Sequence, residues 1–248
     1  MTEWKPSRFT NAQRYDAAYA ILEKLKDTYG EELLAVAVEG STAKRLDHAY
    51  SDLELQVVLD RKSYHRWHAF FYQGLFTGIS YNSLERVRED AATIDYEWPV
   101  SGDGFSESEV LYDPGFLYHE LRRINKHAVS EADFMALIYE ALMDLYEHVY
   151  KIFTLRSDET IALHQEIASI GYWAAITVGL ANRHQFPSAK RMVIESTQLA
   201  DTPQDYGQLI GELYEGDATQ ATEKLWRAFT KWAEQKEITV KDDALHSI

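Results

Sequence analysis

Residues 37–54 read AVEGSTAKRLDHAYSDLE, and they join two segments that each have the pattern of a buried strand. Before them, residues 33–38 form the continuous apolar run LLAVAV, which is typical of a strand buried on both faces. After the turn, apolar residues recur at every second position, which indicates a second strand built on Leu53, Leu55, Val57 and Leu59. Gly40 and Ser41 break the first run and lead into a short helix.

The turn between these strands has the residues that a phosphate-binding loop needs. A glycine at position 40 lets the backbone approach a phosphate, and the N–H groups at a helix start favour an anion. Lys44 and Arg45 follow one turn later in the expected helix, from where either side chain can reach a phosphate oxygen. The predicted nucleotide-binding residues are therefore Gly40, Ser41, Lys44 and Arg45.

Two acidic residues begin the second strand. Asp52 and Glu54 are two positions apart, so both carboxylates are expected on the same face of the strand. Mg²⁺ is held in proteins by one or two carboxylates together with phosphate oxygens, and this pair lies beside the predicted phosphate site. A solvated strand face is the alternative interpretation of the pair taken alone. The combination predicts Asp52 and Glu54 as metal ligands.

The rest of the N-terminal half adds a helix and one more strand. Thr10 and Gln13 form a capping box, and the apolar spacing after them predicts a helix that Gly30 ends. A third strand is expected over residues 76–81, with Gly78 inside it. His65, Trp67 and their aromatic neighbours are expected to pack in a loop or at a strand edge rather than to bind a ligand.

The C-terminal half has a different character. A polar, glycine-containing loop is expected over residues 99–114, and helical periodicity begins near residue 116. Helices are expected over residues 131–154, 160–182, 188–199, 204–214 and 218–237. The sequence thus predicts an α+β fold: a mixed sheet with flanking helices over residues 1–125, followed by an all-α helical bundle over 126–248.

Composition narrows the class of protein. The formal net charge of the 248 residues is −15, which argues against a general nucleic-acid binder and is compatible with a cationic ligand. The chain has no cysteine, so disulfides and thiolate metal sites are excluded, and its nine histidines lack zinc spacing. No stretch approaches the roughly 18 apolar residues that span a bilayer, and no apolar signal segment is visible. We expect a soluble, cytoplasmic protein without membrane or nucleic-acid partners.

The segment 37–54 resembles, without a gap, the Gly-Ser…Asp-x-Asp/Glu signature of the DNA polymerase beta-like nucleotidyltransferase superfamily, and within it the kanamycin (aminoglycoside 4′-O-) nucleotidyltransferase family. Similar counterparts follow in the same order along most of the chain: EWP at 97–99, YD at 112–113, ALIYE at 136–140 and GL at 179–180. The family's fold, a five-stranded nucleotidyltransferase domain followed by a helical bundle, agrees with the prediction made from the residues.

The resemblance implies a particular reaction. It implies Mg²⁺-dependent transfer of AMP from ATP, or of another nucleoside monophosphate, to a hydroxyl of an aminoglycoside antibiotic, with release of pyrophosphate. The hydroxyl implied is the one at the 4′ position, and the result would be antibiotic resistance. It also implies a homodimer whose active site is completed by both subunits.

A second group of polar residues lies on the expected helix 131–154. Glu140, Asp144 and His148 follow one another at i, i+4 and i+8 and therefore share one face, which by itself fits a solvated stripe. The resemblance implies that Asp144 is the catalytic base, and we expect Glu140 and His148 to bind substrate. The family has a lysine where this chain has His148, and Lys151 is the nearby alternative source of a cation.

One position departs from the superfamily pattern. Many members carry a third carboxylate on a later strand, where this chain has Gly78. Asp144, contributed by a partner subunit, is the candidate to replace it. Two other readings stay open: the same chemistry on a different acceptor, either another antibiotic or a protein, and a nucleotidyltransferase fold that has lost catalysis and serves in binding.

Overall fold

The computed structural model describes residues 6–156 and 158–239. The chain forms two compact units, the first from Met1–Ile94 and Ser101–Ala132, the second from Asp95–Val100 and Asp133–Ile248. The domain boundary expected at residues 125–126 falls inside a helix of the first unit, α5 (Leu117–Glu131). A short linking segment, 95–100, therefore belongs with the helical unit although it precedes the end of the sheet unit in sequence.

The first unit is a five-stranded mixed sheet with helices on both faces, as the sequence predicted. Its strands lie in the order β3-β4-β2-β1-β5; β2 and β4 are parallel, and the other neighbouring strands are antiparallel. The elements are α1 (Asn11–Tyr29), β1 (Leu33–Glu39), α2 (Gly40–Ala43), β2 (Leu53–Leu59), β3 (His65–Tyr72), β4 (Leu75–Ser83), α3 (Leu84–Ala92), β5 (Glu109–Tyr112) and α5. A short 3-10 turn, Gly30–Glu32, joins α1 to β1.

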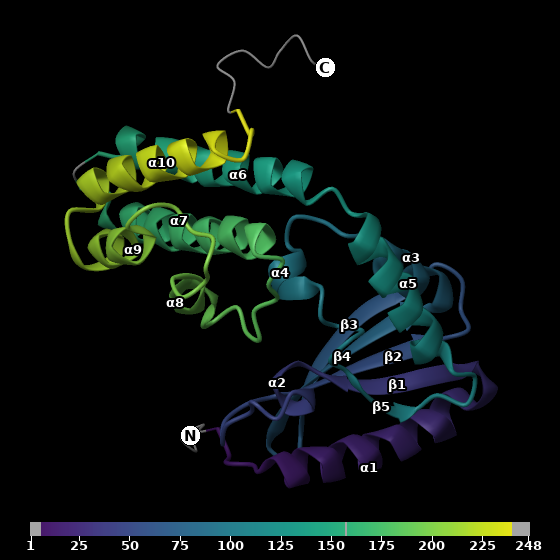
Figure 1. Cartoon of the computed structure of the whole chain (residues 1–248). Helices are drawn as coiled ribbons and strands as arrows, with labels where there is room; N and C mark the ends of the chain where they lie inside the picture. The colour runs from purple at the N-terminus through teal and green to yellow at the C-terminus, as the bar shows by residue number, and fades with distance from the viewer. Residues whose placement is uncertain (1–5, 157, 240–248) are drawn as a thin grey trace. The chain divides into compact units, whose positions relative to one another are not determined.

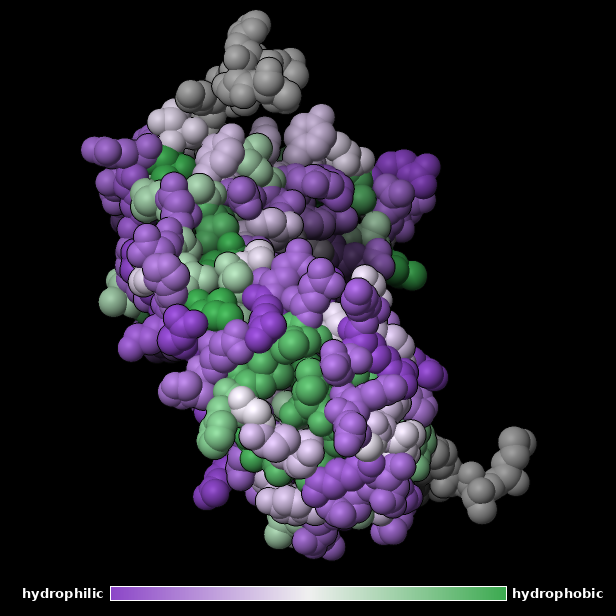
Figure 2. Space-filling model, turned by 90° about the vertical axis from the view of Figure 1, so that its right-hand side faces the viewer, coloured by the Kyte–Doolittle hydropathy of each residue, from purple (hydrophilic) through white to green (hydrophobic). Residues whose placement is uncertain are grey.

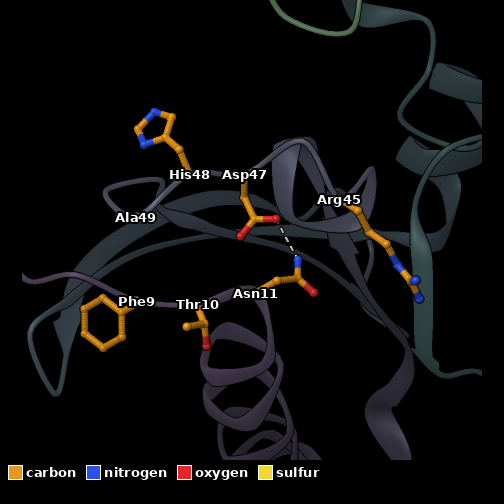
Figure 3. A pocket seen from close by; sticks show the side chains of 7 residues that line it. All are labelled: Phe9, Thr10, Asn11, Arg45, Asp47, His48 and Ala49. Carbon is orange, nitrogen blue, oxygen red and sulfur yellow. Dashed lines mark hydrogen bonds between the residues drawn. The ribbon is translucent and has the colours of Figure 1, made fainter.

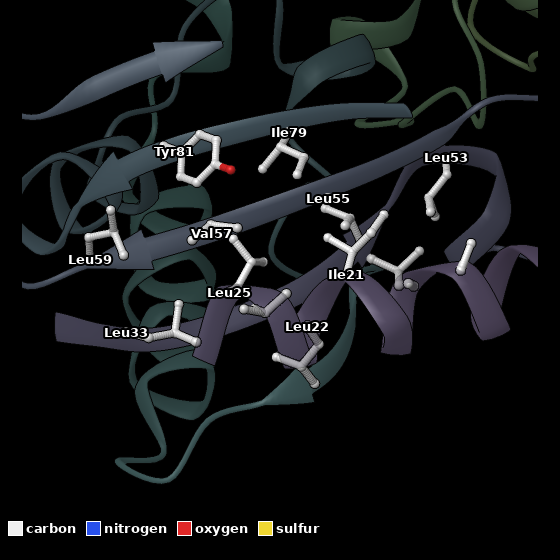
Figure 4. Packing of buried hydrophobic residues seen from close by; sticks show 14 of the residues in the cluster. Ile21, Leu22, Leu25, Leu33, Leu53, Leu55, Val57, Leu59, Ile79 and Tyr81 are labelled. Carbon is white, nitrogen blue, oxygen red and sulfur yellow. The ribbon is translucent and has the colours of Figure 1, made fainter. Parts of the chain in front are cut away.

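Alternation along the central strands supplies both cores (Figures 1 and 4). On one face, Ile21, Leu22 and Leu25 of α1 pack against β2 side chains such as Leu55 and Val57. On the opposite face, α3 and α5 cover small residues of β1, including Ala35 and Ala37. Because the central strands are buried on both sides, β1 is continuously apolar, which is the pattern that predicted it.

Two elements of this unit, β5 and α3, were not expected from the sequence, and the segment of β3 was left open between a loop and a strand edge. The segment of β3 is an edge strand with mostly exposed side chains, so it lacks the apolar alternation of a half-buried strand. β5 lies inside the expected loop 99–114 and is only four residues long, so pairing with β1 defines it. α3 follows β4 directly and begins at the N-cap Ser83, whose hydroxyl accepts a hydrogen bond from the N–H of Arg86 at 3.2 Å.

The second unit is all helical, as predicted. Its elements are α4 (Trp98–Ser101), α6 (Phe134–Thr154), α7 (Thr160–Ala181), α8 (Met192–Ser196), α9 (Tyr206–Glu215) and α10 (Ala218–Glu234). α6 and α7 pack together along their lengths, and so do α9 and α10 (Figure 1). Asp133 is the N-cap of α6, because its side chain accepts hydrogen bonds from the N–H groups of Met135 and Ala136. α6 therefore begins at Phe134, three residues later than expected.

Hydrophilic side chains cover most of the face seen in Figure 2, with apolar side chains gathered in patches between them. In the second unit the exposed large apolar residues include Tyr150 and Phe153 on α6 and Ile161 on α7. Within residues 6–156 and 158–239, no helix is long and apolar enough to cross a membrane.

Candidate active site

The turn from β1 into α2 has a backbone conformation that favours glycine. Gly40 has φ +63°, in the left-handed region, and a Cβ placed there would lie 2.0 Å from Oε2 of Glu54. The carboxylate of Glu54 therefore rests directly against the backbone of the turn. This contact brings a β2 carboxylate to Gly40, the first of the predicted phosphate-binding residues.

The two predicted metal ligands occupy different positions in the secondary structure. Glu54 lies inside β2, opposite Glu39 of β1, and is partly buried. Asp52 is exposed and immediately precedes β2, which begins at Leu53, rather than lying within the strand. The hydroxyl of Thr42 in α2 donates to the carbonyl oxygen of Asp52 at 3.3 Å, so the start of β2 is tied to the helix that follows Gly40.

Glu39 is an acidic residue that the sequence reading did not assign to the site. Burial, and after it the negative charges of Glu54 and Asp103, raise the pKa of the Glu39 carboxyl from 4.5 to about 8, against the opposing effect of Lys44. Its place at the end of an apolar strand, one residue before Gly40, was the available signal. Like charges held together in this way favour the binding of a cation.

The two predicted cations differ in their surroundings. α2 ends at Ala43, so Lys44 caps a four-residue helix and Arg45 follows it with φ +56°; neither lies within a continuing helix as expected. Nζ of Lys44 forms an ion pair with Asp103, and both side chains are largely buried. Arg45 is exposed. Of the two cations, Lys44 is the one held beside the carboxylates.

β4 offers no third carboxylate. Gly78 lies opposite Glu54 in the parallel pairing of β2 and β4. A Cβ on Gly78 would lie 2.2 Å from the indole of Trp67 on β3, so that aromatic side chain covers the glycine. Trp67 is therefore packed over β4, as expected for this aromatic group, while 55% of it stays exposed.

A buried arginine fixes the loop that leads to Asp52. Arg14 of α1 is fully buried; its guanidinium donates to the carbonyl oxygens of His48 at 2.7 Å and Ser51 at 2.8 Å, and to Oδ2 of Asp47 at 2.8 Å. Asn11 also donates to Asp47, at 2.7 Å. This role of Arg14 was not predicted from the sequence, because an arginine in an amphipathic helix normally faces solvent.

A shallow pocket of about 480 Å³ lies over this loop (Figure 3). Its lining residues are Phe9, Thr10, Asn11, Arg45, Asp47, His48 and Ala49. Asp47 points inward to Asn11, whereas the side chain of Arg45 is directed away from the other residues drawn. The polar groups at its floor are thus already used to hold the loop.

We expect Arg14→Met to lower the free energy of unfolding by about 3–5 kcal/mol, because Asp47 would remain buried without its counter-ion. The Asp47 side chain is only 4% exposed, so water cannot replace the guanidinium without opening the loop. Urea unfolding measures the change. The double variant Arg14→Met/Asp47→Asn should recover part of the loss, and a single-variant loss below about 1 kcal/mol would contradict a buried, stabilising pair.

The raised pKa of Glu39 predicts how stability depends on pH. Between its unfolded value near 4.5 and its folded value of about 8, the folded protein holds a proton that the unfolded chain releases. The stabilising contribution is therefore fully present below pH 4.5 and is lost as pH rises through about 8. Glu39→Gln should flatten this dependence and raise Tm at pH 8.5 by at least about 2 °C, whereas the exposed control Glu31→Gln should not. Thermal melts in metal-free buffer from pH 5 to 9 test this, and parallel curves for wild type and Glu39→Gln would refute it.

The second unit contains Asp144, the residue predicted to be the catalytic base. Asp144 of α6 is partly buried and accepts a hydrogen bond from the side chain of Tyr96. Burial raises the pKa of Asp144, and the charges of Glu147 and Glu97 raise this pKa further, while His148 and the Tyr96 hydrogen bond lower it. Glu140, one helical turn before Asp144, is not among these causes.

The linking segment 95–100 supplies residues that the sequence reading missed. The hydroxyl of Tyr172 on α7 donates to Oε1 of Glu97 at 2.9 Å, and the rings of Tyr96 and Trp173 lie 5.5 Å apart. Burial raises the pKa of the Tyr172 phenol, and Glu97 raises it as well. The EWP segment at 97–99 supports the resemblance, but nothing in its sequence predicted a role for Glu97 in the site.

The other predicted residues of α6 are accounted for as follows. Glu140 is exposed on the same face as Asp144. His148 bonds through Nδ1 to Oε2 of Glu166 on α7, at 2.7 Å. Lys151, the alternative cation, is paired with Glu147 at 2.6 Å on its own helix. Of the apolar residues of α6, Ala141, Leu142 and Leu145 are buried, whereas Leu137 is only partly buried.

The carboxylates of the first unit fit Mg²⁺ as a site with two protein ligands. Among the described residues, no group of three acidic, histidine or cysteine side chains is arranged to hold a metal ion. Mg²⁺ usually takes only one or two carboxylates and completes its shell with water and phosphate oxygens. Asp52 and Glu54 match that smaller requirement, and the crowding of Glu39 and Glu54 provides the electrostatic reason for a cation to bind there.

Comparison with known proteins places the chain in a family. The KNTase C-terminal domain family matches residues 115–239, just over half of the 248 residues, and the chain belongs to this family. Over 237 residues it is 22% identical to the aminoglycoside nucleotidyltransferase (4′) of Staphylococcus aureus, an alignment that covers 93% of this chain and 94% of that protein. The enzyme of the same name from a Bacillus species aligns with the same identity and coverage.

Among solved structures, a nucleotidyltransferase-like protein from Exiguobacterium sibiricum aligns with a TM-score of 0.47 and 13% identity, covering 89% of this chain and 74% of that one. By sequence, the chain is a distant, full-length relative of aminoglycoside nucleotidyltransferases.

Proposed function

We propose that the protein transfers AMP from ATP to a hydroxyl of an aminoglycoside, the one at the 4′ position, and releases pyrophosphate. The observation that carries this proposal is the contact of the Glu54 carboxylate with the backbone of Gly40, which brings an acidic side chain to the proposed phosphate-binding turn. The similarity over nearly the whole chain to two enzymes named for aminoglycoside nucleotidyl transfer supports the choice of acceptor.

The first unit would bind and orient the nucleotide. Asp52 and Glu54 would hold Mg²⁺, which when bound neutralises the triphosphate and makes its α-phosphorus easier to attack. The backbone of Gly40 and Ser41 would hold the β- and γ-phosphates together with Arg45 and Lys44. The ion pair with Asp103 holds the charge of Lys44 near the site. On nucleotide binding, Lys44 would exchange this contact for one with a phosphate oxygen.

The second unit would bind the acceptor and take its proton. Asp144 would accept the proton of the attacking hydroxyl while that oxygen bonds to the α-phosphorus and pyrophosphate leaves in line. Glu140 and His148 would bind the amino sugar. The acidic neighbours Glu97 and Glu147 suit an acceptor with several ammonium groups.

The direct test is an assay of pyrophosphate release with ATP, Mg²⁺ and a panel of aminoglycosides. We expect acceptor-dependent release that requires Mg²⁺, and mass spectrometry should show one added AMP per acceptor. Acceptors that lack the 4′-hydroxyl should not react. Nucleotide binding without release for any aminoglycoside would instead favour a different acceptor or a binding protein.

We also propose a homodimer in which both chains complete each active site, as the resemblance implies. Exposed apolar side chains on α6, Tyr150 at 61% and Phe153 at 51%, offer a surface for such a contact. We expect that mixing inactive Asp52→Asn chains with inactive Asp144→Asn chains restores activity, because a mixed dimer would hold one intact site. Light scattering gives the oligomeric state, and no recovery after demonstrated subunit exchange would mean that each site lies within one chain.

A further inference from the structure

α6 and α7 lie side by side, and one polar contact between them involves His148 and Glu166 (Figure 1). Nδ1 of His148 lies 2.7 Å from Oε2 of Glu166, and the two side chains are only 20% and 18% exposed. An ionised carboxylate can only accept a hydrogen bond, so the ring nitrogen that faces Glu166 must carry the proton. Glu166 therefore selects the Nδ1–H form of His148.

This selection determines what the other ring nitrogen can do. When the imidazole is neutral and Nδ1 is protonated, Nε2 has a lone pair and acts as a hydrogen-bond acceptor. No further hydrogen bond to the His148 ring is found within the part of the chain that the structure describes. Nε2 is thus the atom of His148 that remains for a ligand, and its orientation is fixed through Glu166.

The charges around His148 indicate what kind of ligand group suits Nε2. Asp144 and Glu147 lie on the same helix and Glu166 on the next, while the nearby cation Lys151 is paired with Glu147. This surrounding is acidic overall, so it disfavours phosphate and favours hydroxyl or ammonium donors. A lysine at this position would make the opposite choice, because an ammonium group can only donate.

We propose that Glu166 is a positioning residue that holds His148 in the Nδ1–H form, so that Nε2 accepts a hydrogen bond from a hydroxyl or ammonium group of the acceptor substrate. This inference rests on the proposed function for its substrate. The pairing itself is a property of α6 and α7 and can be tested without turnover.

The first test reads the tautomer directly. In ¹⁵N-resolved NMR spectra of the whole protein at pH 8.5, Nδ1 of His148 should have the shift of a protonated ring nitrogen and Nε2 that of an unprotonated one. Glu166→Leu should reverse the preference, because free neutral imidazole favours the Nε2–H form. Glu166→Gln, whose amide oxygen can still accept, should retain it. The opposite tautomer in the wild-type protein would overturn the proposal.

The second test reads the contact with substrate, using kanamycin as the probe. Glu166→Leu should weaken kanamycin binding in calorimetry, and raise its KM, by about tenfold, with the KM for ATP unchanged. Glu166→Gln should stay within about threefold of wild type. Glu166→Gln is also the matched charge control, because it removes the same negative charge as Glu166→Leu while its amide oxygen can still accept from Nδ1–H of His148. An equal effect of Glu166→Gln and Glu166→Leu would show a charge effect alone and refute positioning.

The two tests separate this inference from the function on which it rests. If wild-type protein neither binds nor modifies kanamycin, the proposed function and the substrate contact both fail, and the tautomer still decides whether Glu166 orients the ring. If the enzyme is active and the tautomer is as expected, but Glu166→Leu leaves kanamycin binding unchanged, the substrate contact is refuted while the proposed function stands.

Discussion

Asp52→Asn and Glu54→Gln are each expected to lower kcat by about a hundredfold or more while the fold is preserved. Both changes are close to isosteric, and each removes one negative charge from the proposed Mg²⁺ site. Asp52 is exposed, and the Glu54 side chain rests on Gly40, so neither substitution opens a cavity in the core. The loss should therefore appear in the chemical step rather than in stability.

Steady-state kinetics at saturating ATP and Mg²⁺, with thermal melts in parallel, measure the two effects separately. Asp60→Asn is the matched control, because Asp60 is an exposed acid directly after the opposite end of β2. It should retain wild-type kcat. Near-normal turnover of Asp52→Asn or Glu54→Gln at saturating Mg²⁺ would show that the metal assignment is wrong.

Asp144→Asn is expected to reduce kcat by about a hundredfold or more, with a much smaller change in the KM for ATP or the aminoglycoside. The amide cannot take the proton of the attacking hydroxyl, although it keeps the size of the side chain. If Asp144 only attracted the cationic sugar, the loss would lie mainly in the aminoglycoside KM and would disappear at high substrate concentration. Glu140→Gln, one helical turn away and exposed, should show that KM pattern.

The pH profile gives a second measure of the same role. Burial raises the pKa of Asp144, and Glu147 and Glu97 raise it further, whereas the base must be ionised to act. kcat should therefore fall as pH decreases through this raised pKa. The acidic limb of the kcat profile should lie at a higher pH than the pKa of an ordinary aspartate would give. Glu97→Gln should shift the limb to lower pH. A limb that stays in place in Asp144→Asn would assign it to another group.

Local patterns of apolar and capping residues predicted much of the fold. Residues 33–38 are apolar without interruption because β1 is buried on both faces, and the capping box at Thr10 begins α1 where it was expected. The long helices of the second unit follow from their periodicity. The sequence left β3 open between a loop and a strand edge, because its side chains are mostly exposed. It did not indicate β5, which is four residues long and defined by its pairing with β1.

The site divides in the same way. The sequence alone determined that Gly40 and Ser41 lead from a buried strand and that Asp52 and Glu54 follow at a fixed spacing, because neighbours along the chain set these relations. Only the tertiary structure decided that Glu39 lies opposite Glu54, that Arg14 holds the loop before Asp52, and that Glu166 meets His148. Each of these contacts joins different elements, and strand register and helix packing, rather than local spacing, bring such residues together.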